Sequence, residues 1–341
     1  MRMRCSITIA VAALVVCASI GAAAPLINGA GATFPYPIYS KWFDEYHKKT
    51  GVQINYQSIG SGGGIRQVLE GTVDFGATDG PMSDEQLGQA KSTILHFPTV
   101  LGAVVMTFNL PGIEKIRLTP ETITGIFLGK ITSWNDPALA KDNPGVALPA
   151  QPIVPVHRSD GSGTTYVFVD YLSKVSPEWA KSVGKNTAVA WPVGLGGKGN
   201  EGVTGLVKQT PNAIGYVELV YAVQNKLPYA DIKNRTGNFV TPTLESVTAA
   251  AAATAAKMPE DFRVSITDPA AADAYPIASF TWLLIPSRIA DADKGKAIVD
   301  FLSWMLADGQ GYTKPLGYAP LPDAVAEMEK KAIGKVQAGA R

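Results

Sequence analysis

The stretch Pro155-Val-His-Arg-Ser-Asp-Gly-Ser-Gly-Thr-Thr-Tyr-Val-Phe168 combines a strand, a polar turn and the start of a helix. Apolar and partly β-branched residues at 153–156 are typical of a short buried strand, and apolar residues between 167 and 172 recur at helical spacing. The turn between them holds one cation, Arg158, one carboxylate, Asp160, two glycines and several hydroxyls. We therefore expect a strand–turn–helix unit with its polar groups gathered at the turn.

This turn has the composition of an oxyanion site. Ser162 and Thr164 can cap the helix, which leaves other N–H groups of its first turn free to face an anion. Arg158 adds a planar fork of donors that suits a tetrahedral oxyanion. An ordinary capped turn with a surface arginine is the alternative, and the segment taken alone slightly favours it.

The order of strand, polar turn and helix recurs three times before residue 90. The three turns carry hydroxyl or carboxylate groups, at Thr33, Ser61 and Asp79. Such alternation predicts a parallel α/β sheet, whose ligand sites lie beyond the carboxyl ends of the strands. We therefore expect these three side chains near one edge of a sheet.

Each glycine-rich or acidic turn also has an ordinary structural explanation. The run 60–64 could be a flexible turn, although its place between a strand and a helix makes anion binding about equally plausible. Asp79 alone is more typical of an Asx turn before Gly80-Pro81. Gly194-Leu-Gly-Gly-Lys-Gly199 has the spacing of a dinucleotide fingerprint, but no clear strand leads into it, so a structured glycine loop is favoured.

Residues 1–24 have the pattern of a secretory signal peptide: a basic start, an apolar run and small residues up to Ala24, after which we expect cleavage. Both cysteines, Cys5 and Cys17, lie in this segment, so the mature chain has neither a disulfide nor a thiolate metal site. Lipidation at Cys17 is an open alternative that the bulky Val16 before it disfavours. We therefore expect an exported protein.

The mature chain is almost electrically neutral. Removing Arg2 and Arg4 lowers the 30 basic residues to 28, against 29 acidic ones. This balance argues against a nucleic-acid-binding protein, and it requires any anion site to be built locally. The three histidines are scattered without metal-ligand spacing, and neither Ser61 nor Ser162 lies in a Gly-x-Ser-x-Gly elbow. Metal and hydrolase chemistry are therefore not indicated.

The chain length suits two domains, and two long apolar runs are expected to connect them. The runs are 95–110 and 276–286. A chain that leaves one domain, builds a second and returns has two crossings, and its cleft can close by a hinge motion. We predict a discontinuous first lobe of residues 25–108 and 278–341, and a second lobe of residues 109–277.

Taken together, five motifs make the mature chain resemble the periplasmic phosphate-binding proteins of bacterial phosphate-specific ABC importers. The motifs are Gly29-Ala-Gly-Ala-Thr-Phe-Pro35, Val73-Asp-Phe-Gly-Ala-Thr-Asp79, Asp160-Gly-Ser-Gly-Thr164, Val193-Gly-Leu-Gly-Gly-Lys-Gly-Asn200 and Ala213-Ile-Gly-Tyr-Val-Glu218. The resemblance implies the type II periplasmic binding protein fold, in which two α/β domains are joined by hinge strands and enclose phosphate. It implies a non-enzymatic monomer without cofactor or metal, which delivers phosphate to a membrane permease and ATPase complex.

The resemblance also implies a set of phosphate ligands and one acid, Asp160, that orients the arginine. The implied ligands are Thr33, Phe34, Ser61, Asp79, Arg158, Ser162, Gly163 and Thr164. The chain departs from the family at Ser61-Gly-Gly-Gly64, where the family often has a second serine.

The resemblance gives Asp79 a role that the residue alone does not suggest. Phosphate keeps a proton near neutral pH and can donate it to a carboxylate, whereas sulfate cannot. Leaving the buried charge unpaired costs roughly 3–5 kcal/mol, so Asp79 is expected to select phosphate. A secreted phosphatase or phosphodiesterase using the same cradle is the alternative function, and an adhesive or sensory protein is a third.

Overall fold

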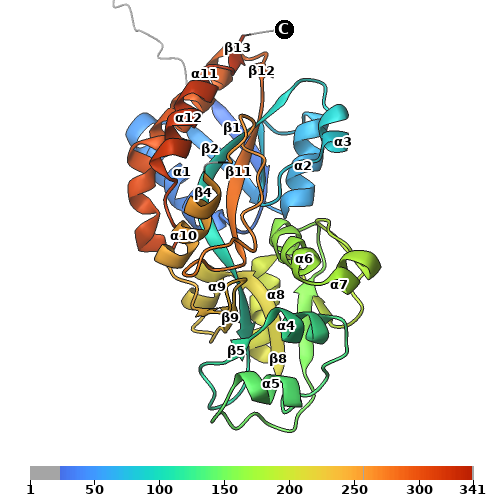
Figure 1. Ribbon diagram of the computed structural model, residues 1–341. Coiled ribbons are helices and arrows are strands. Elements are labelled where there is room, and N and C mark those ends of the chain that lie inside the picture. The colour runs from blue at the N-terminus through green and yellow to red at the C-terminus, as the bar shows by residue number, and fades with distance from the viewer. Residues whose placement is uncertain (1–23, 256, 340–341) are drawn as a thin grey trace, which may run out of the picture.

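The structure, a computed structural model, describes residues 24–255 and 257–339 (Figure 1). The predicted signal peptide therefore lies outside the described residues, apart from Ala24. Within the described part of the chain, no helix is long and apolar enough to cross a membrane.

One mixed sheet of eight strands runs through the molecule in the order β2-β1-β3-β11-β4-β8-β6-β7. Its strands are β1 (Leu26–Gly31), β2 (Gln53–Ser58), β3 (Phe75–Thr78), β4 (Ile94–Phe108), β6 (Val154–Arg158), β7 (Leu195–Gly197), β8 (Ala213–Glu218) and β11 (Ala278–Pro286). Two small sheets contain β5 (Arg117–Leu118), β9 (Asp231–Lys233) and β10 (Phe239–Val240), and β12 (Arg288–Ile289) and β13 (Gln337–Ala338).

Strand β4 joins the two halves of this sheet. Over fifteen residues it pairs first with β11, through Ile94 to Ala103, and then with β8, through Val104 to Phe108. The predicted crossing run is therefore one continuous strand. We call the elements around β1, β2, β3 and β11 the first lobe and those around β8, β6 and β7 the second lobe; Figure 1 shows them one above the other.

The first lobe has the predicted strand–turn–helix order. Strand β1 is parallel to β2 and β3, and helices cover both faces of the sheet (Figure 1). Its helices are α1 (Tyr36–Thr50), α2 (Ser61–Glu70), α3 (Asp84–Gly88), α11 (Ala292–Leu306) and α12 (Asp323–Ile333), with short 3-10 helices at Asp308–Tyr312 and Lys314–Leu316.

Helix α1 shows how local sequence builds these elements. A proline stands in its first turn, and Gly51 ends it in the left-handed conformation, with φ of 77°. Its apolar face buries Ile38, Tyr39 and Trp42 against the sheet. The helix therefore starts directly after the first polar turn and fixes that turn beside the strand ends.

In the second lobe, β6 is parallel to both β8 and β7, and β8 is antiparallel to β4. The helices that follow β4 in the chain are α4 (Pro120–Phe127), α5 (Pro137–Asp142), α6 (Gly163–Val175), α7 (Pro177–Ser182), α8 (Gly199–Gln209), α9 (Leu219–Gln224) and α10 (Leu244–Ala255). Helix α10 packs against β11 and β4.

The glycine run 60–64 is not a flexible turn. Ser61 is the first residue of α2, so the three glycines after it belong to the first helical turn. Helix α2 packs closely on the ends of β1 and β3, and a Cβ on Gly64 would lie within 2.8 Å of backbone atoms of Gly31 and Ala77. Close packing of helix against strand explains the glycine there.

We expect Gly64→Ala to destabilise the protein by about 1–3 kcal/mol, because the added methyl group must push backbone apart. Gly205→Ala, in helix α8, is the matched control: a Cβ there meets no atom within 4 Å. The control should be neutral or stabilise by roughly 0.5–1 kcal/mol, since alanine favours helix over glycine. Urea unfolding followed by tryptophan fluorescence measures both; equal effects would contradict the packing of α2.

Candidate functional site

The predicted site residues come together between the two lobes, and they are buried. Thr33 and Phe34 follow β1, Ser61 begins α2 and Asp79 follows β3, all in the first lobe. Arg158 ends β6, and Ser162, Gly163 and Thr164 form the start of α6, in the second lobe. Asp79 is 1 % exposed and Arg158 3 % exposed, while the side chains of Ser61, Ser162 and Thr164 are fully buried.

Direct contacts close the lobes over this site. The Gly62 N–H donates to the Gly161 carbonyl across the lobes at 2.9 Å. Gly163 lies so close to Ser61 and Asp79 that a Cβ on it would collide with both side chains. Gly60, with φ of 88°, lies equally close to Asp160 and Gly161. The first-lobe and second-lobe parts of the site therefore form one enclosed surface.

Arg158 is held in place by Asp160. Its Nε and Nη2 donate to the two carboxylate oxygens at 2.8 and 2.6 Å, a bidentate pair, and its Nη1 donates to Thr164 Oγ1 at 3.3 Å. Burial alone would raise the pKa of Asp160, but the Arg158 guanidinium and the Gly199 N–H outweigh it and lower that pKa. Asp160 therefore stays ionised and neutralises much of the arginine's charge.

Asp79 is in a very different environment from Asp160. Its Oδ1 accepts a hydrogen bond from Thr281 Oγ1 at 2.8 Å, and its backbone N–H donates to Ser61 Oγ at 3.2 Å. Its Oδ2 is buried and has no hydrogen-bond partner among the described residues. Burial raises the pKa of the Asp79 carboxyl to about 7, although the Thr281 hydrogen bond and the charge of Arg158 oppose the change. Asp79 thus presents one unpartnered acceptor to the site.

The start of α6 supplies donors. Ser162 is the N-cap, and its Oγ accepts from the Thr165 N–H at 3.0 Å, so its own hydroxyl hydrogen remains available. Within residues 24–255 and 257–339, the Gly163 and Thr164 N–H groups have no acceptor. Thr164 is not a cap, contrary to the sequence interpretation, because it lies inside the first turn and its Oγ1 accepts from Arg158.

Three further side chains hold the site together and were not singled out from the sequence. Asn200 links Thr33 to Thr164 through its amide nitrogen. Tyr221 Oη donates to the Thr33 carbonyl at 2.5 Å, and Tyr318 Oη donates to the Phe34 carbonyl at 2.7 Å. Asn200 ends a glycine-rich motif that carries part of the family resemblance, whereas the two tyrosines have no local signal.

Among the described residues, no histidine is hydrogen-bonded to a serine of the site, as a hydrolase triad requires. His157 stacks on Trp191, with ring centroids 4.9 Å apart, and its Nδ1 lies 3.0 Å from the Arg158 carbonyl rather than beside a serine. No cluster of His, Cys, Asp or Glu that could hold a metal occurs among the described residues. The glycine segment 194–199, for which the sequence favours a structured loop, forms edge strand β7 and the start of α8.

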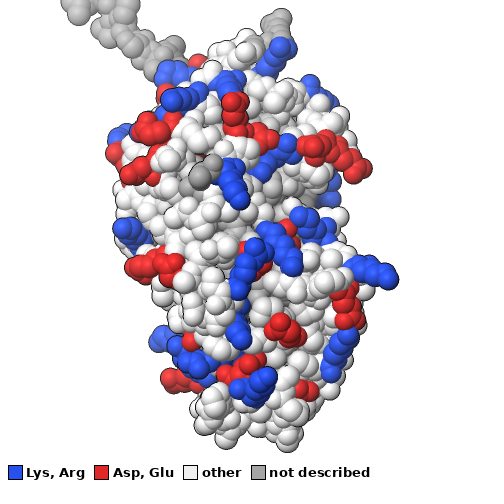
Figure 2. Space-filling view, in the orientation of Figure 1, with Lys and Arg blue, Asp and Glu red and all other residues white. Residues whose placement is uncertain are grey.

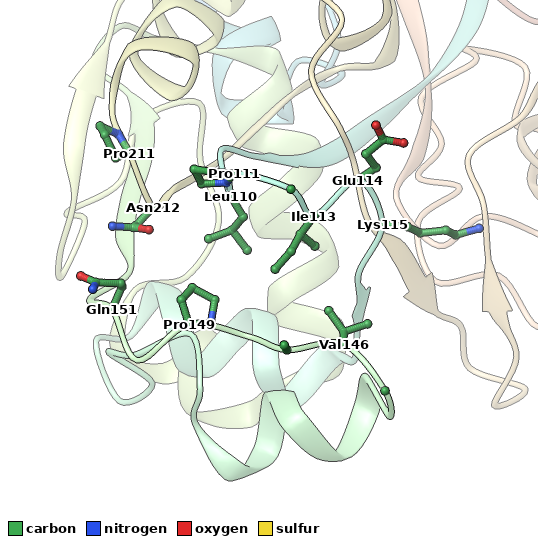
Figure 3. Close-up of a pocket in the computed structure, with 13 residues that line it drawn as sticks. Leu110, Pro111, Ile113, Glu114, Lys115, Val146, Pro149, Gln151, Pro211 and Asn212 are labelled. Carbon is green, nitrogen blue, oxygen red and sulfur yellow. The ribbon is translucent and has the colours of Figure 1, made fainter.

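On the face shown in Figure 2, acidic and basic side chains are interspersed. A separate hollow of about 790 Å³ lies in the second lobe, beyond the end of β4 (Figure 3). Leu110, Ile113 and Pro149 line it, and none of the predicted site residues does. The enclosed site between the lobes is therefore the candidate functional site.

An enclosed polar site between two α/β lobes is the arrangement of a ligand-binding protein of the PBP superfamily. The family model described as PBP superfamily domain matches residues 18–308. Over 298 residues the chain is 48 % identical to the phosphate-binding protein PstS of Xylella fastidiosa, covering 87 % of this chain and 81 % of the relative. It is 46 % identical over 306 residues to PstS of Pasteurella multocida, covering 89 % and 88 %.

The chain belongs to this family of phosphate-binding proteins. Its fold is also that of the solved phosphate-binding protein from Stenotrophomonas maltophilia, with a TM-score of 0.69, 20 % sequence identity, and coverage of 90 % of this chain and 93 % of the other. The two-lobed α/β fold expected from the sequence is thereby confirmed.

The raised pKa of Asp79 makes stability depend on pH. A carboxyl whose pKa is about 7 when folded, against 3.8 when unfolded, stabilises the fold below about pH 4, and this stabilisation is lost as pH rises to about 7. Asn at this position does not titrate. In phosphate-free buffer, we expect the unfolding free energy of Asp79→Asn minus that of the unmutated protein to rise by up to about 4 kcal/mol over this range.

Denaturant unfolding at several pH values measures this difference, and above pH 7 it should stay constant. Glu329, whose pKa burial raises, is present in both proteins, so its contribution cancels. The charge of Asp79 helps to raise the pKa of Glu218, so the measured difference includes the repulsion between these two carboxyls. A difference independent of pH would show that water reaches Asp79, and it would contradict the enclosed geometry.

Proposed function

We propose that this protein binds inorganic phosphate between its two lobes and delivers it to a membrane permease for import. The proposed ligands are Thr33, Phe34, Ser61, Asp79, Arg158, Ser162, Gly163 and Thr164, with Asp160 orienting the arginine. The unpartnered Oδ2 of buried Asp79, facing the donors of the other lobe, carries the proposal.

Most of this site favours any tetrahedral oxyanion. The Arg158 guanidinium, the free N–H groups of Gly163 and Thr164 and the hydroxyls of Ser61 and Ser162 can all donate. Such donors disperse the charge of an anion without a cluster of lysines, which agrees with the nearly neutral mature chain. Attraction alone would therefore not separate phosphate from sulfate.

Asp79 can distinguish phosphate from sulfate. Its Oδ2 can accept a hydrogen bond, and phosphate keeps a proton to donate near neutral pH. Sulfate carries no proton there, so its oxygen would face the ionised carboxylate without a hydrogen bond and with like charge. In an enclosed site neither group can turn to water, so the mismatch costs binding free energy.

Movement of the two lobes allows phosphate to enter and leave the site. We propose that residues 25–108 and 278–341 form the first lobe and residues 109–277 the second, and that the two separate by a hinge motion at the crossing strands. The change of partner within β4, from β11 to β8 after Ala103, and the contacts of Gly62 and Gly163 across the lobes support two lobes. Helix α10 packs on β11 and β4, so part of the segment 109–277 contacts the first lobe. Because the site residues are almost completely buried, phosphate enters only after the lobes part.

The names of the relatives and the sequence pattern support a proposal for where the protein works and which proteins it works with. We propose a monomer that is exported through the signal peptide at residues 1–24, works in the periplasm, and passes phosphate to a permease and ATPase complex of the ABC type. The relatives are named as binding proteins, and no nucleophile–base pair occurs among the described site residues, so the proposed function has no chemical step.

Isothermal titration with phosphate and with sulfate tests the proposal. We expect the unmutated protein to bind phosphate and to discriminate strongly against sulfate at pH 8. Asp79→Asn should reduce that discrimination about a hundredfold or more, because an amide can donate to sulfate where the carboxylate repels it.

Asp231→Asn is the control, since Asp231 is equally a buried aspartate but lies in β9 and pairs with Lys115. It should leave the ratio of the two affinities unchanged. No phosphate binding by the unmutated protein would refute the function, and unchanged selectivity in Asp79→Asn would refute the role of Asp79 alone.

A further inference from the structure

Asn200 lies at the start of α8, fully buried, and its side chain connects the two lobes. Its Nδ2 donates to Thr33 Oγ1 at 2.7 Å in the first lobe and to Thr164 Oγ1 at 3.0 Å in the second. Its backbone N–H also donates to Thr33 Oγ1, at 3.3 Å. One residue thus contacts the hydroxyls of two proposed phosphate ligands on opposite walls of the site.

The orientation of the Asn200 amide is determined by its surroundings. Its Oδ1 accepts from the Glu218 N–H at 2.9 Å, and a backbone N–H can only donate. The amide nitrogen must therefore face the two threonines, and each of its two hydrogens has an acceptor. Glu218 ends β8, next to the point where β4 passes from one lobe to the other, so the amide is anchored near the crossing.

These contacts determine whether the Thr33 and Thr164 hydroxyls can donate or accept further hydrogen bonds. A hydroxyl has one hydrogen to donate and two lone pairs that accept. Thr33 Oγ1 accepts twice from Asn200, and Thr164 Oγ1 accepts once from Asn200 and once from Arg158 Nη1. Only the hydrogens remain, and no acceptor for either is found among the described residues. Both hydroxyls are therefore left as donors.

We propose that Asn200 is a positioning residue, which fixes Thr33 and Thr164 as hydrogen-bond donors to phosphate and does so only when the lobes are closed. The inference rests on the proposed function. Thr33 belongs to the first lobe and Asn200 to the second, so opening separates them and frees the Thr33 hydroxyl to rotate. Phosphate can therefore accept from Thr33 and Thr164 and donate to Asp79 at the same time only when the lobes are closed.

A double-mutant cycle between Asn200 and Thr33 tests this role, because a residue that acts through another loses its effect when that other is removed. We expect Asn200→Ala to weaken phosphate binding roughly tenfold to a hundredfold, the range for a lost hydrogen bond to a charged group. In a Thr33→Val background, the same substitution should cost at least about threefold less. Isothermal titration of the four proteins gives the cycle.

Asn234→Ala is the matched control. Asn234 is also a buried amide, and its Nδ2 donates to three backbone carbonyls, at Ala271, Ala272 and Ala274, without touching the site. We expect this variant to lower the unfolding free energy and to leave phosphate affinity unchanged. Circular dichroism establishes folding of each variant, and Asn200→Ser, too short to span both hydroxyls, replaces Asn200→Ala in the cycle if the latter does not fold.

The outcomes separate the inference from the function on which it rests. Phosphate binding by the unmutated protein with fully additive costs in the cycle would overturn the positioning role and leave the proposed function standing. An unmutated protein that does not bind phosphate would overturn both. An unchanged affinity in a folded Asn200 variant would also overturn the positioning role.

Discussion

Arg158 is a buried cation, and its charge must be neutralised by a group close to it. The structure of the second lobe around Arg158 depends on this constraint. Arg158 is almost inaccessible to water, so the bidentate contact with Asp160 offsets the loss of its hydration. Asp160 in turn accepts from the Gly199 N–H, which ties the end of β6 to the start of α8. Gly196 and Gly197 of strand β7 allow this approach, because a Cβ there would collide with Ser159 and with the backbone of α8. The ion pair thus positions both the arginine and the helix that carries Asn200.

On the first-lobe side of the site, Asp79 is a buried acid that has no ion-pair partner among the described residues. Asp79 is buried but has only Thr281 and a backbone contact to Ser61, which leaves one oxygen unpaired. The two aspartates therefore have opposite pKa shifts in one site: the pKa of Asp160 is lowered by its arginine, and that of Asp79 is raised by burial. Asp160 stabilises the donor Arg158, and Asp79 remains free to accept a hydrogen bond.

Much of this arrangement could be predicted from the sequence because its signals are local. The strand–turn–helix order placed Thr33, Ser61 and Asp79 at neighbouring strand ends, and the apolar run before residue 110 indicated the crossing strand. The reason for glycine at position 64 could not be predicted, because it is the backbone of Gly31 and Ala77, which are distant in the sequence. The contacts of Asn200, Tyr221 and Tyr318 with the turn after β1 join residues 167 to 284 positions apart. No pattern along the chain encodes such a contact.

The position of β11 in the sheet has a consequence for how the chain folds. This strand lies between β3 and β4, yet it begins at residue 278, long after both. The middle of the first lobe is therefore completed by one of the last strands to be synthesised, and β3 and β4 have no direct pairing to form without it. Closing so long a loop is slow, because its entropy is lost before the pairing is gained. A chain with this order of strands leaves its first half without a finished sheet until most of the polypeptide has been made.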